Sequence, residues 1–406
     1  MKVLRYGSQE LNKIYQRHLG QKKRVEDKVS RIIDEVRAGG DEALVRFTRK
    51  FDKVKLLPRH LRVSETEISA AYQNITADFV TTLKSVIENV SRFYKKQLKK
   101  SWRLKDADGV VVGENLQPLE RVGVYIPSGT APLVSTVYMT VLPAKIAGVK
   151  SIALATPPAK DGVVNPYILV VADLLKVNEI YRVGGAQAIA ALALGTKTIP
   201  PVDKIVGPGN AYVTEAKRQV FGYVDIDILA GPTELVIIAN RYSNPNFILA
   251  DLAAQSEHLG GLSILITTSK PLIKQLKNRL SSGYIIYAKN LEQAAEIANH
   301  IAPEHLQIIT NNPQRVLRLI KNAGAVFLGP YSPASVGDYV AGPSHVLPTL
   351  GTARFFSGLG LNDFIKSTHI IAYSKKSLEK VRAPLEKIAG IEGLNRHLES
   401  VKARFI

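Results

Sequence analysis

The segment Ile180-Tyr-Arg-Val-Gly-Gly-Ala-Gln-Ala-Ile-Ala-Ala-Leu-Ala-Leu194 decides the fold class of this chain. Residues 180–183 predict a short strand because most of them are apolar or aromatic. Two glycines then make a turn, and the alanine- and leucine-rich residues 185–194 predict a helix. A strand that passes through a turn into a helix is the unit from which parallel, helix-covered sheets are built.

The same alternation continues through most of the chain beyond Gly109. Strands are expected at 110–112, 121–126, 152–155, 180–183, 235–239, 263–267, 307–310 and 325–328. Helices are expected between them, near 132–147, 166–176, 185–194, 209–221, 246–258, 270–281, 291–300 and 313–322. These are too many units for one small sheet, so we expect two α/β domains with a crossing at Ala230-Gly-Pro232. The sequence shows no internal repeat.

Both ends of the chain carry helical patterns instead. Residues 22–38 have apolar positions at helical spacing and stop at Gly39-Gly40, a signal for a helix C-terminus. Ser64 and Glu67 have the spacing of a capping box, and Thr76 precedes a long helix that extends to about Leu98. Residues 376–404 return to a charged helical pattern, so helical appendages are expected at both ends.

The composition indicates a globular protein and limits its chemistry. The 406 residues are 46% hydrophobic, carry a net charge of +19 and include no cysteine. The lack of cysteine excludes disulfides and thiolate catalysis, so any transition metal must be held by nitrogen and oxygen donors. No apolar run has the length of a membrane span and the N-terminus is unlike a signal peptide, so we expect a cytoplasmic protein with no membrane partner.

The positive charge raises a non-enzyme alternative, nucleic-acid binding through the basic N-terminal region. Residues 1–105 hold 25 Lys and Arg against 12 Asp and Glu, so most of the excess lies there. These charges are spread over helical patterns, where they predict a solvated face. No interleaved aromatic residues or binding module accompany them, so we expect no nucleic-acid partner.

Four histidines in the C-terminal part of the chain each have a carboxylate or an amide nearby. They occur in Gln255-Ser-Glu-His258, in Pro303-Glu-His305, between Asp338 and His345, and between Glu392 and His397. Imidazole, carboxylate and amide groups bind metals and carry protons, so the clustering indicates a metal or proton-transfer site. The other histidines do not belong to such a cluster; they are His18, His60, His300 and His369.

The clusters also have simpler interpretations. Gln255 and His258, three residues apart on a helix, could share one ion, but such a pair is also typical of an ordinary helix end. Asp338 and His345 lie in a loop rich in glycine and proline, where the aspartate could simply cap a turn. The cluster nearest the C-terminus could belong to a solvated helical face.

Glu304 and His305 are adjacent, directly before a predicted strand. A carboxylate and an imidazole side by side suit general acid and base catalysis, because they can divide the proton transfers. The alternative is a pair of polar loop residues. A zinc peptidase is disfavoured, because the chain has no H-E-x-x-H motif and Pro303 would break the helix that such a motif needs.

Two glycine loops, Val183-Gly-Gly-Ala-Gln187 and Val206-Gly-Pro-Gly-Asn210, each follow a strand and open a helix. Their backbone amides could face an anion. Neither loop completes the G-x-G-x-x-G pattern of dinucleotide-binding folds. From the pattern alone, turn formation is the simpler role of these glycines.

Taken together and in order, these segments resemble the histidinol dehydrogenase family from about residue 20 to 400. Nine motifs carry the resemblance: Val122-Gly-Val-Tyr-Ile-Pro-Ser-Gly129, Gly184-Gly-Ala-Gln-Ala-Ile-Ala-Ala191, Val206-Gly-Pro-Gly-Asn-Ala-Tyr-Val-Thr214, Ala230-Gly-Pro-Thr-Glu234, Gln255-Ser-Glu-His258, Ala302-Pro-Glu-His-Leu306, Gly337-Asp-Tyr339, Ser344-His-Val-Leu-Pro-Thr349 and Glu392-Gly-Leu394. Each motif alone is a weak match, whereas nine in the same order are very specific.

The resemblance implies a role for each matching residue. Zinc ligands are implied at Gln255, His258, Asp338 and His397, with His397 supplied by the partner subunit of a homodimer. The acid and base pair is implied at Glu304 and His305, and NAD contacts at Tyr125, Gln187 and Asn210. Substrate contacts are implied at Thr233, His345 and Glu392, together with His305 and the four zinc ligands.

The reaction that the resemblance implies is the oxidation of L-histidinol to L-histidine, the last steps of histidine biosynthesis, with one zinc ion per subunit, two NAD and one water. His305 would remove the hydroxyl proton in the first oxidation, and Glu304 would activate water for the second oxidation of the bound aldehyde. The alternative is a related zinc- and NAD-dependent alcohol dehydrogenase that acts on a different alcohol.

The expected fold is α/β, with two doubly wound, incomplete Rossmann-like domains and small helical appendages at both ends. An N-terminal arm is expected at 1–20. The first α/β domain is expected at 21–124 plus 235–358, with the metal and acid–base residues, and the second at 125–234, with the NAD contacts. A C-terminal helical tail at 359–406 is expected to reach the partner subunit.

Overall fold

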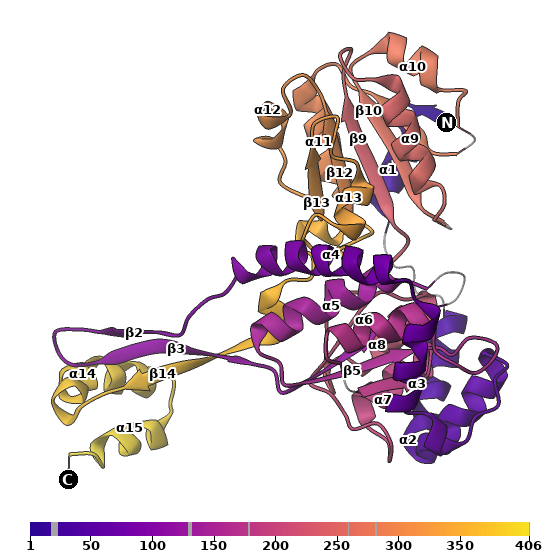
Figure 1. The fold of residues 1–406 in the computed structure, drawn as a ribbon. Helices are drawn as coiled ribbons and strands as arrows, with labels where there is room; N and C mark the ends of the chain where they lie inside the picture. Colours follow the sequence, from indigo (N-terminus) through magenta and orange to yellow (C-terminus); the bar gives the residue numbers. More distant parts are fainter. Residues whose placement is uncertain (18–22, 129–131, 178, 259, 281, 406) are drawn as a thin grey trace. The chain divides into compact units, whose positions relative to one another are not determined.

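The computed structural model describes residues 1–17, 23–128, 132–177, 179–258, 260–280 and 282–405. The last residues of the expected arm at 1–20 and of the motif at 122–129 lie outside these ranges. Internal contacts divide the chain into two compact units (Figure 1). Unit 1 comprises Met1–Gln97 and Leu119–Phe364, and unit 2 comprises Leu98–Pro118 and Ile365–Ile406.

Unit 1 contains a parallel sheet of five strands in the order β6-β5-β4-β7-β8. The strands are β4 (Arg121–Tyr125), β5 (Ser151–Thr156), β6 (Glu179–Arg182), β7 (Lys204–Val206) and β8 (Asp225–Ile226). From β4 the chain moves outward through β5 and β6, and then returns to place β7 on the other side of β4. The change of direction lies between β4 and β7, where the carboxyl ends of parallel strands commonly bind ligands.

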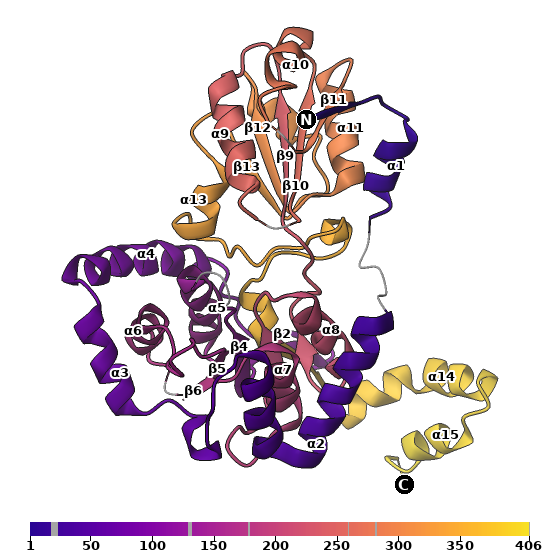
Figure 2. The same cartoon turned by 90° about the vertical axis from the view of Figure 1, so that its right-hand side faces the viewer.

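Helices cover both faces of this sheet (Figure 2). One face packs against α7 (Gly185–Leu194), α8 (Ala211–Val220) and α2 (Lys23–Phe51), whose buried side chains share one apolar core with the strands. The other face is covered by α5 (Val134–Ala147) and α6 (Pro166–Leu174), on which α4 (Ala77–Lys95) and α3 (Glu65–Ala71) pack. Because both faces are covered, β4 and β5 are buried at every position after the first and do not alternate between buried and exposed residues.

Helix α2 is two helical segments joined at Gly40, whose φ of 49° and ψ of −132° favour glycine. The helix end expected at Gly39-Gly40 is therefore confirmed. Helix α2 packs on the five-stranded sheet, whereas the domain division expected from the sequence groups residues 21–124 with 235–358. That division of the chain stays a prediction.

A second parallel sheet in unit 1 has six strands in the order β1-β11-β10-β9-β12-β13. The strands are β1 (Lys2–Leu4), β9 (Glu234–Ala239), β10 (Leu262–Thr267), β11 (Tyr284–Tyr287), β12 (His305–Ile309) and β13 (Ala325–Leu328). The order around β9 repeats the order around β4, although the sequence has no internal repeat. A common topology needs only short apolar strands in the same succession, so the two halves need not share residues.

Helices also cover both faces of the six-stranded sheet. Helices α9 (Pro245–Gln255) and α10 (Lys270–Leu276) form one core with it. Helices α1 (Gln9–Tyr15), α11 (Leu291–Ile301) and α12 (Pro313–Leu317) form the other. The α/β class with parallel sheets is confirmed. Strands β1, β7, β8 and β11 are missed by the sequence-based prediction, because runs of two to four residues give little signal.

Unit 2 is an antiparallel sheet of three strands with two helices. The sheet has the order β14-β3-β2, with β14 (Ile365–Ala372), β3 (Val111–Pro118) and β2 (Trp102–Lys105), and is followed by α14 (Lys375–Ile391) and α15 (Asn395–Lys402). The helical pattern expected at 376–404 is confirmed. The sequence does not predict β2 or β14, because most of their residues are exposed and carry no apolar alternation. Among the described residues, no helix is long and apolar enough to cross a membrane.

Candidate active site

Glu304 and His305 lie where a helix gives way to a strand. Helix α11 ends at Ile301, and Ala302 adopts a left-handed conformation with φ 47°. Pro303 cannot continue a helix, and β12 begins at His305. Glu304 therefore precedes the strand and His305 begins it, close to the position that the sequence predicts and beside the amino ends of β9 and β13.

The ring of His305 is held from both sides. Its Nδ1 lies 3.2 Å from the carbonyl oxygen of Glu234, and its Nε2 lies 3.5 Å from Oδ1 of Asp338. Both partners accept hydrogen bonds, and the contact of Nδ1 is the shorter of the two, so the geometry favours the proton on Nδ1 when the ring is neutral. This leaves Nε2 with a free electron pair, which makes it the nitrogen that can accept a proton.

The carboxyl group of Glu304 is buried next to the same backbone. Its Oε2 accepts a hydrogen bond from the backbone N–H of Glu234 at 2.9 Å, and the side chain of Thr233 also hydrogen-bonds to it. Burial raises the pKa of Glu304 to about 7, although the charge of His305 and these hydrogen bonds act in the opposite direction. A carboxyl group with a pKa near neutrality suits a general acid or base.

The pKa of His305 is shifted by opposing causes. Burial alone would lower it, but the negative charges of Glu304 and Asp338 raise the pKa of His305 to about 9. Because the two groups interact closely, Glu304 and His305 titrate as a coupled pair. The site therefore contains two adjacent groups that can each accept a proton in the neutral to alkaline range.

Asp338 lies on α13 (Ala334–Tyr339) and is half-buried. Burial would raise its pKa, but the hydrogen bond and charge of His305, together with the charges of His345 and His258, lower the pKa of Asp338 below its ordinary value. Asp338 therefore carries a negative charge among imidazoles. The interaction with His258 brings together two residues that are 80 positions apart in the sequence.

Gln255 is the last residue of α9 and is only 6% exposed. Its Nε2 has no hydrogen-bond partner in the described part of the chain. An unpaired amide in a buried position is costly, so this side chain has capacity for a further partner. His258 lies three residues beyond the end of α9, whereas the sequence predicts both residues on one helix, so their pairing stays a prediction.

The donors Gln255, His258 and Asp338 fit a metal ion that prefers nitrogen and oxygen ligands. Within the described ranges, no group of three or more His, Cys, Asp or Glu side chains is arranged to hold an ion. The candidate set in unit 1 counts only two such side chains, since the third is the amide of Gln255. A complete site therefore needs a ligand from elsewhere.

A pocket of about 530 Å³ opens beside these residues. His305, Asp338 and His345 line it together with Phe93, Gln97 and Phe327, whose ring contacts that of His305. Glu304 is not among the lining residues and lies behind His305. The pocket is large enough for a small molecule that reaches Nε2 of His305.

His345 lies at the edge of this pocket with both ring nitrogens engaged. Its Nδ1 donates to the carbonyl oxygen of Asp338 at 3.0 Å, and its Nε2 lies 3.1 Å from the hydroxyl of Thr136. Burial lowers its pKa, so the ring is neutral. Its predicted role as a substrate contact would require exchange of the Thr136 hydroxyl for a substrate group.

The three predicted cofactor contacts follow strands of the five-stranded sheet. Tyr125 ends β4 and its hydroxyl accepts a hydrogen bond from the backbone N–H of Gly185 at 3.0 Å. Gln187 is buried in the first turn of α7, and Asn210 caps the N-terminus of α8. A Cβ at Gly207 would lie 2.1 Å from the carbonyl oxygen of Tyr125, so this loop needs glycine. The structure thus gathers these residues at the carboxyl ends of β4, β6 and β7.

The remaining predicted residues lie in unit 2. Glu392 forms the C-cap of α14 and His397 lies in the first turn of α15, and both are exposed. They are not brought together with the other candidates within one unit. Their predicted roles therefore stay predictions.

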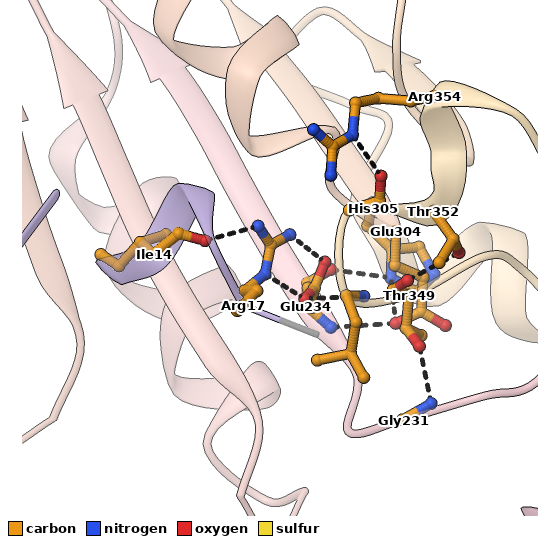
Figure 3. A network of polar contacts seen from close by, with 11 residues as sticks. Ile14, Arg17, Gly231, Glu234, Glu304, His305, Thr349, Thr352 and Arg354 are labelled. Atoms are coloured by element: carbon orange, nitrogen blue, oxygen red, sulfur yellow. Dashed lines mark hydrogen bonds and ion pairs between the residues drawn. The ribbon is translucent and has the colours of Figure 1, made fainter. Parts of the chain in front are cut away.

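The sequence-based reasoning assigned no role to Glu234, which contacts the acid–base pair, or to Arg17, which binds Glu234 (Figure 3). Glu234 is 1% exposed and forms an ion pair with Arg17. Its signal in the sequence is a single acidic residue at the start of the apolar run 235–239. Arg17 has no comparable signal, since it is one of many basic residues in the N-terminal region.

The fold and the site define a parallel α/β enzyme with a buried carboxylate and imidazole pair beside a pocket. A family model described as histidinol dehydrogenase matches residues 15–405. The chain is 49% identical over 393 residues to the histidinol dehydrogenase of Clostridium acetobutylicum, covering 92% of this chain and 91% of that protein. It is 46% identical over 400 residues to the one of Listeria monocytogenes, covering 94% and 93%.

A solved structure agrees with these relatives. The crystal structure of histidinol dehydrogenase from Elizabethkingia anophelis has a TM-score of 0.93 and 36% identity, and the match covers 100% of this chain and 98% of that one. The chain belongs to the histidinol dehydrogenase family, and it is an oxidoreductase.

Proposed function

We propose that this chain oxidises L-histidinol to L-histidine through a bound aldehyde, with two NAD and one water. Family membership supports the substrate and the reaction class. The observation that carries the proposal is that His305 lines the pocket while Oε2 of Glu304 lies 3.5 Å from its Nδ1. An alcohol-to-acid oxidation needs two proton acceptors at one carbon, and these two side chains supply them.

In the first oxidation, Nε2 of His305 accepts the hydroxyl proton of the alcohol. The electron pair of the C–H bond leaves as hydride, and the alcohol carbon becomes an aldehyde. Asp338 stabilises the protonated imidazole, since its carboxylate lies 3.5 Å from Nε2. The Nδ1 contact with Glu234 keeps the ring oriented during the transfer.

In the second oxidation, Glu304 accepts a proton from the water that adds to the aldehyde. After His305 has released its first proton to solvent, it accepts a second proton from the hydrated aldehyde, whose carbon then loses a second hydride and becomes the carboxylate carbon. Thr233 is proposed to contact the substrate, and its hydrogen bond with Glu304 places it next to the reacting groups. The buried position of Glu304 keeps bulk water away from its carboxyl group.

Zinc is the metal that we propose for this site. Three ligands, Gln255, His258 and Asp338, would come from one subunit, and the fourth would be His397 of the partner subunit of a homodimer. When bound, it would position the nitrogens of the substrate and act as a Lewis acid. The burial of Gln255, whose amide oxygen would be the donor, and the charge of Asp338 support this assignment. His345 and the partner's Glu392 are proposed as substrate contacts.

NAD is proposed to bind at the carboxyl ends of β4, β6 and β7, next to Tyr125, Gln187 and Asn210. The N-termini of α7 and α8 point their backbone N–H groups to this side of the sheet and would favour the pyrophosphate. The enzyme is proposed to be cytoplasmic. Residues 125–234 would form the NAD-binding domain, and the tail at 359–406 would reach the partner.

The NADH yield tests the proposal. Limiting L-histidinol should give about two equivalents of NADH per molecule, and chelation should abolish the reaction. One equivalent or none would contradict the proposed reaction. A higher kcat/KM for another alcohol in a competition assay would support the alternative, a related zinc- and NAD-dependent alcohol dehydrogenase.

A further inference from the structure

A buried ion pair, Arg17–Glu234, lies behind the acid–base residues (Figure 3). Nε and Nη2 of Arg17 each donate to one carboxylate oxygen of Glu234 at 2.6 Å. The side chain of Glu234 is 1% exposed and that of Arg17 is 13% exposed. Two parallel hydrogen bonds in a buried position fix the orientation of the carboxylate as well as compensating its charge.

The peptide groups of Glu234 contact both acid–base residues. Its N–H donates to Oε2 of Glu304, and its carbonyl oxygen accepts from Nδ1 of His305. Glu234 is also the first residue of β9, so strand pairing fixes the backbone after it but not before it. The ion pair of its side chain therefore holds a backbone position that strand pairing alone holds weakly.

The carboxylate of Glu234 also binds a third segment. Its Oε1 accepts a hydrogen bond at 3.0 Å from the N–H of Leu350, whose φ of 56° is uncommon for leucine. The neighbouring Thr349 accepts a hydrogen bond from the N–H of Gly231 at 2.6 Å. The segment that precedes β9 is thus held at Gly231 and again at Glu234.

Arg17 is itself anchored. Its Nη1 donates to the carbonyl oxygen of Ile14 in α1 at 2.9 Å. Leu11 and Ile14 of this helix are buried in the core of the six-stranded sheet. The guanidinium group therefore reaches Glu234 from a fixed element.

We propose that Arg17 and Glu234 are positioning residues for the proton transfers. Their ion pair holds the peptide groups of residue 234 so that Glu304 keeps its orientation and neutral His305 keeps its proton on Nδ1. This inference rests on the proposed function of Glu304 and His305 in proton transfer. A merely structural ion pair would stabilise the fold without affecting the orientation of either group.

Two substitutions of Arg17 and one matched control test this proposal. Arg17→Met removes the charge and both hydrogen-bond donors. Arg17→Lys keeps the charge but lacks the planar guanidinium group that donates two parallel hydrogen bonds. The control is Arg121→Met, because Arg121 also binds a carboxylate, that of Glu179, through two hydrogen bonds of 2.6 Å in a partly buried position. Arg121 begins β4, and in the described part of the chain its guanidinium group hydrogen-bonds to Ser151 and Glu179, not to Glu304 or His305.

The kinetic result expected is a loss of kcat without loss of substrate binding. Arg17→Met should lower kcat by about 10-fold or more and leave the KM for histidinol within about twofold, with Arg17→Lys between it and the unsubstituted enzyme. Arg121→Met should lower thermal stability while its kcat stays within about twofold. Equal kcat losses at Arg17 and Arg121 would contradict a positioning role.

A second measurement does not depend on activity. In protein labelled with ¹⁵N-histidine, the His305 signals, assigned by their absence in His305→Gln, should show a protonated Nδ1 and an unprotonated Nε2 in the neutral ring. Arg17→Met or the milder Arg17→Lys should shift this tautomer balance, whereas Arg121→Met should not. Unchanged signals in both folded Arg17 variants would overturn the inference. If the unsubstituted enzyme fails to oxidise histidinol, the proposed function fails, but these signals still decide the role of the ion pair.

Discussion

Nε2 of His305 lies 3.5 Å from Oδ1 of Asp338, and both side chains line the same pocket. His305 begins strand β12, whereas Asp338 belongs to helix α13. The proposed proton acceptor and a proposed metal ligand thus meet at one wall of the pocket. Substitutions on either side of this contact separate proton transfer from metal binding.

His305→Gln should abolish the first proton transfer. We expect kcat to fall by about 10² to 10⁴-fold, because a positioned general base contributes that much, while the KM for histidinol changes by less than about threefold. Initial rates of NADH formation measure both constants. A kcat within tenfold of the unsubstituted enzyme would mean that another group accepts the proton.

Glu304→Gln should separate the two oxidations. Because Gln cannot accept a proton from water, we expect about one equivalent of NADH in a fast phase and a slow second equivalent. Rapid mixing of excess enzyme with histidinol measures the two phases. Equal slowing of both phases would contradict the separate role of Glu304.

The pH dependence of aldehyde oxidation follows from the same residue. Burial raises the pKa of Glu304 to about 7, and only its ionised form can accept a proton. The rate with the aldehyde supplied directly should therefore rise through about pH 7 and level off above it. Glu304→Gln should remove this inflection, and an inflection that survives in the variant would assign it to another group.

Asp52→Asn should stabilise the fold in a pH-dependent way. Burial raises the pKa of Asp52 to about 6, and its Oδ2 has no hydrogen-bond partner within the described ranges. A carboxyl group whose pKa is raised in the folded state stabilises the fold at pH values below its ordinary pKa of 3.8. This stabilisation is lost as the pH rises through about 6. The variant should gain on the order of 1–2 kcal/mol at pH 8 and nothing at pH 4.

Denaturant unfolding at the two pH values measures this gain. The matched control is Asp34→Asn, because the side chain of Asp34 is 65% exposed and forms only a surface ion pair with Arg37. Its unfolding free energy should change little at either pH. A gain for Asp52→Asn that is equal at pH 4 and pH 8 would contradict the assigned cause.

Removal of the proposed metal ligand Gln255 should lower the metal content. Gln255→Ala should reduce bound zinc in elemental analysis, and activity should return in part when zinc is added in excess. Glu257→Ala is the control, because Glu257 lies between Gln255 and His258 in the sequence and is exposed. Full zinc occupancy in Gln255→Ala would exclude this residue as a ligand.

Mixed dimers test whether His397 acts across the subunit interface. His397→Ala and His305→Gln should each be inactive alone, but a mixed dimer contains one site with both native residues. Co-refolding equal amounts should restore about a quarter of the unsubstituted activity, since half of the dimers are mixed and each has one intact site. No recovery in dimers shown to be mixed would place His397 in the site of its own subunit.

Local sequence patterns predicted the fold class and much of the candidate site. The glycine turn after Val183 and the alanine-rich helix that follows it depend on neighbouring residues, so they can be predicted without knowledge of distant parts of the chain. The same holds for Glu304 and His305, whose place before a strand follows from Pro303 and the apolar residues after it. Short or exposed strands such as β11 and β2 were missed, because pairing with other strands defines them.

The sequence by itself determined the parallel α/β class, the family and the identity of the candidate residues, because repeated strand-and-helix units and ordered motifs are local properties of the chain. Only the tertiary structure decided that Arg17 reaches Glu234, that the peptide groups of Glu234 bind Glu304 and His305, and that Asp338 faces Nε2. These contacts join residues that are 33 to 217 positions apart in the sequence, so only folding brings them together. Burial in that arrangement, which no local pattern encodes, raises the pKa of Glu304 to about 7.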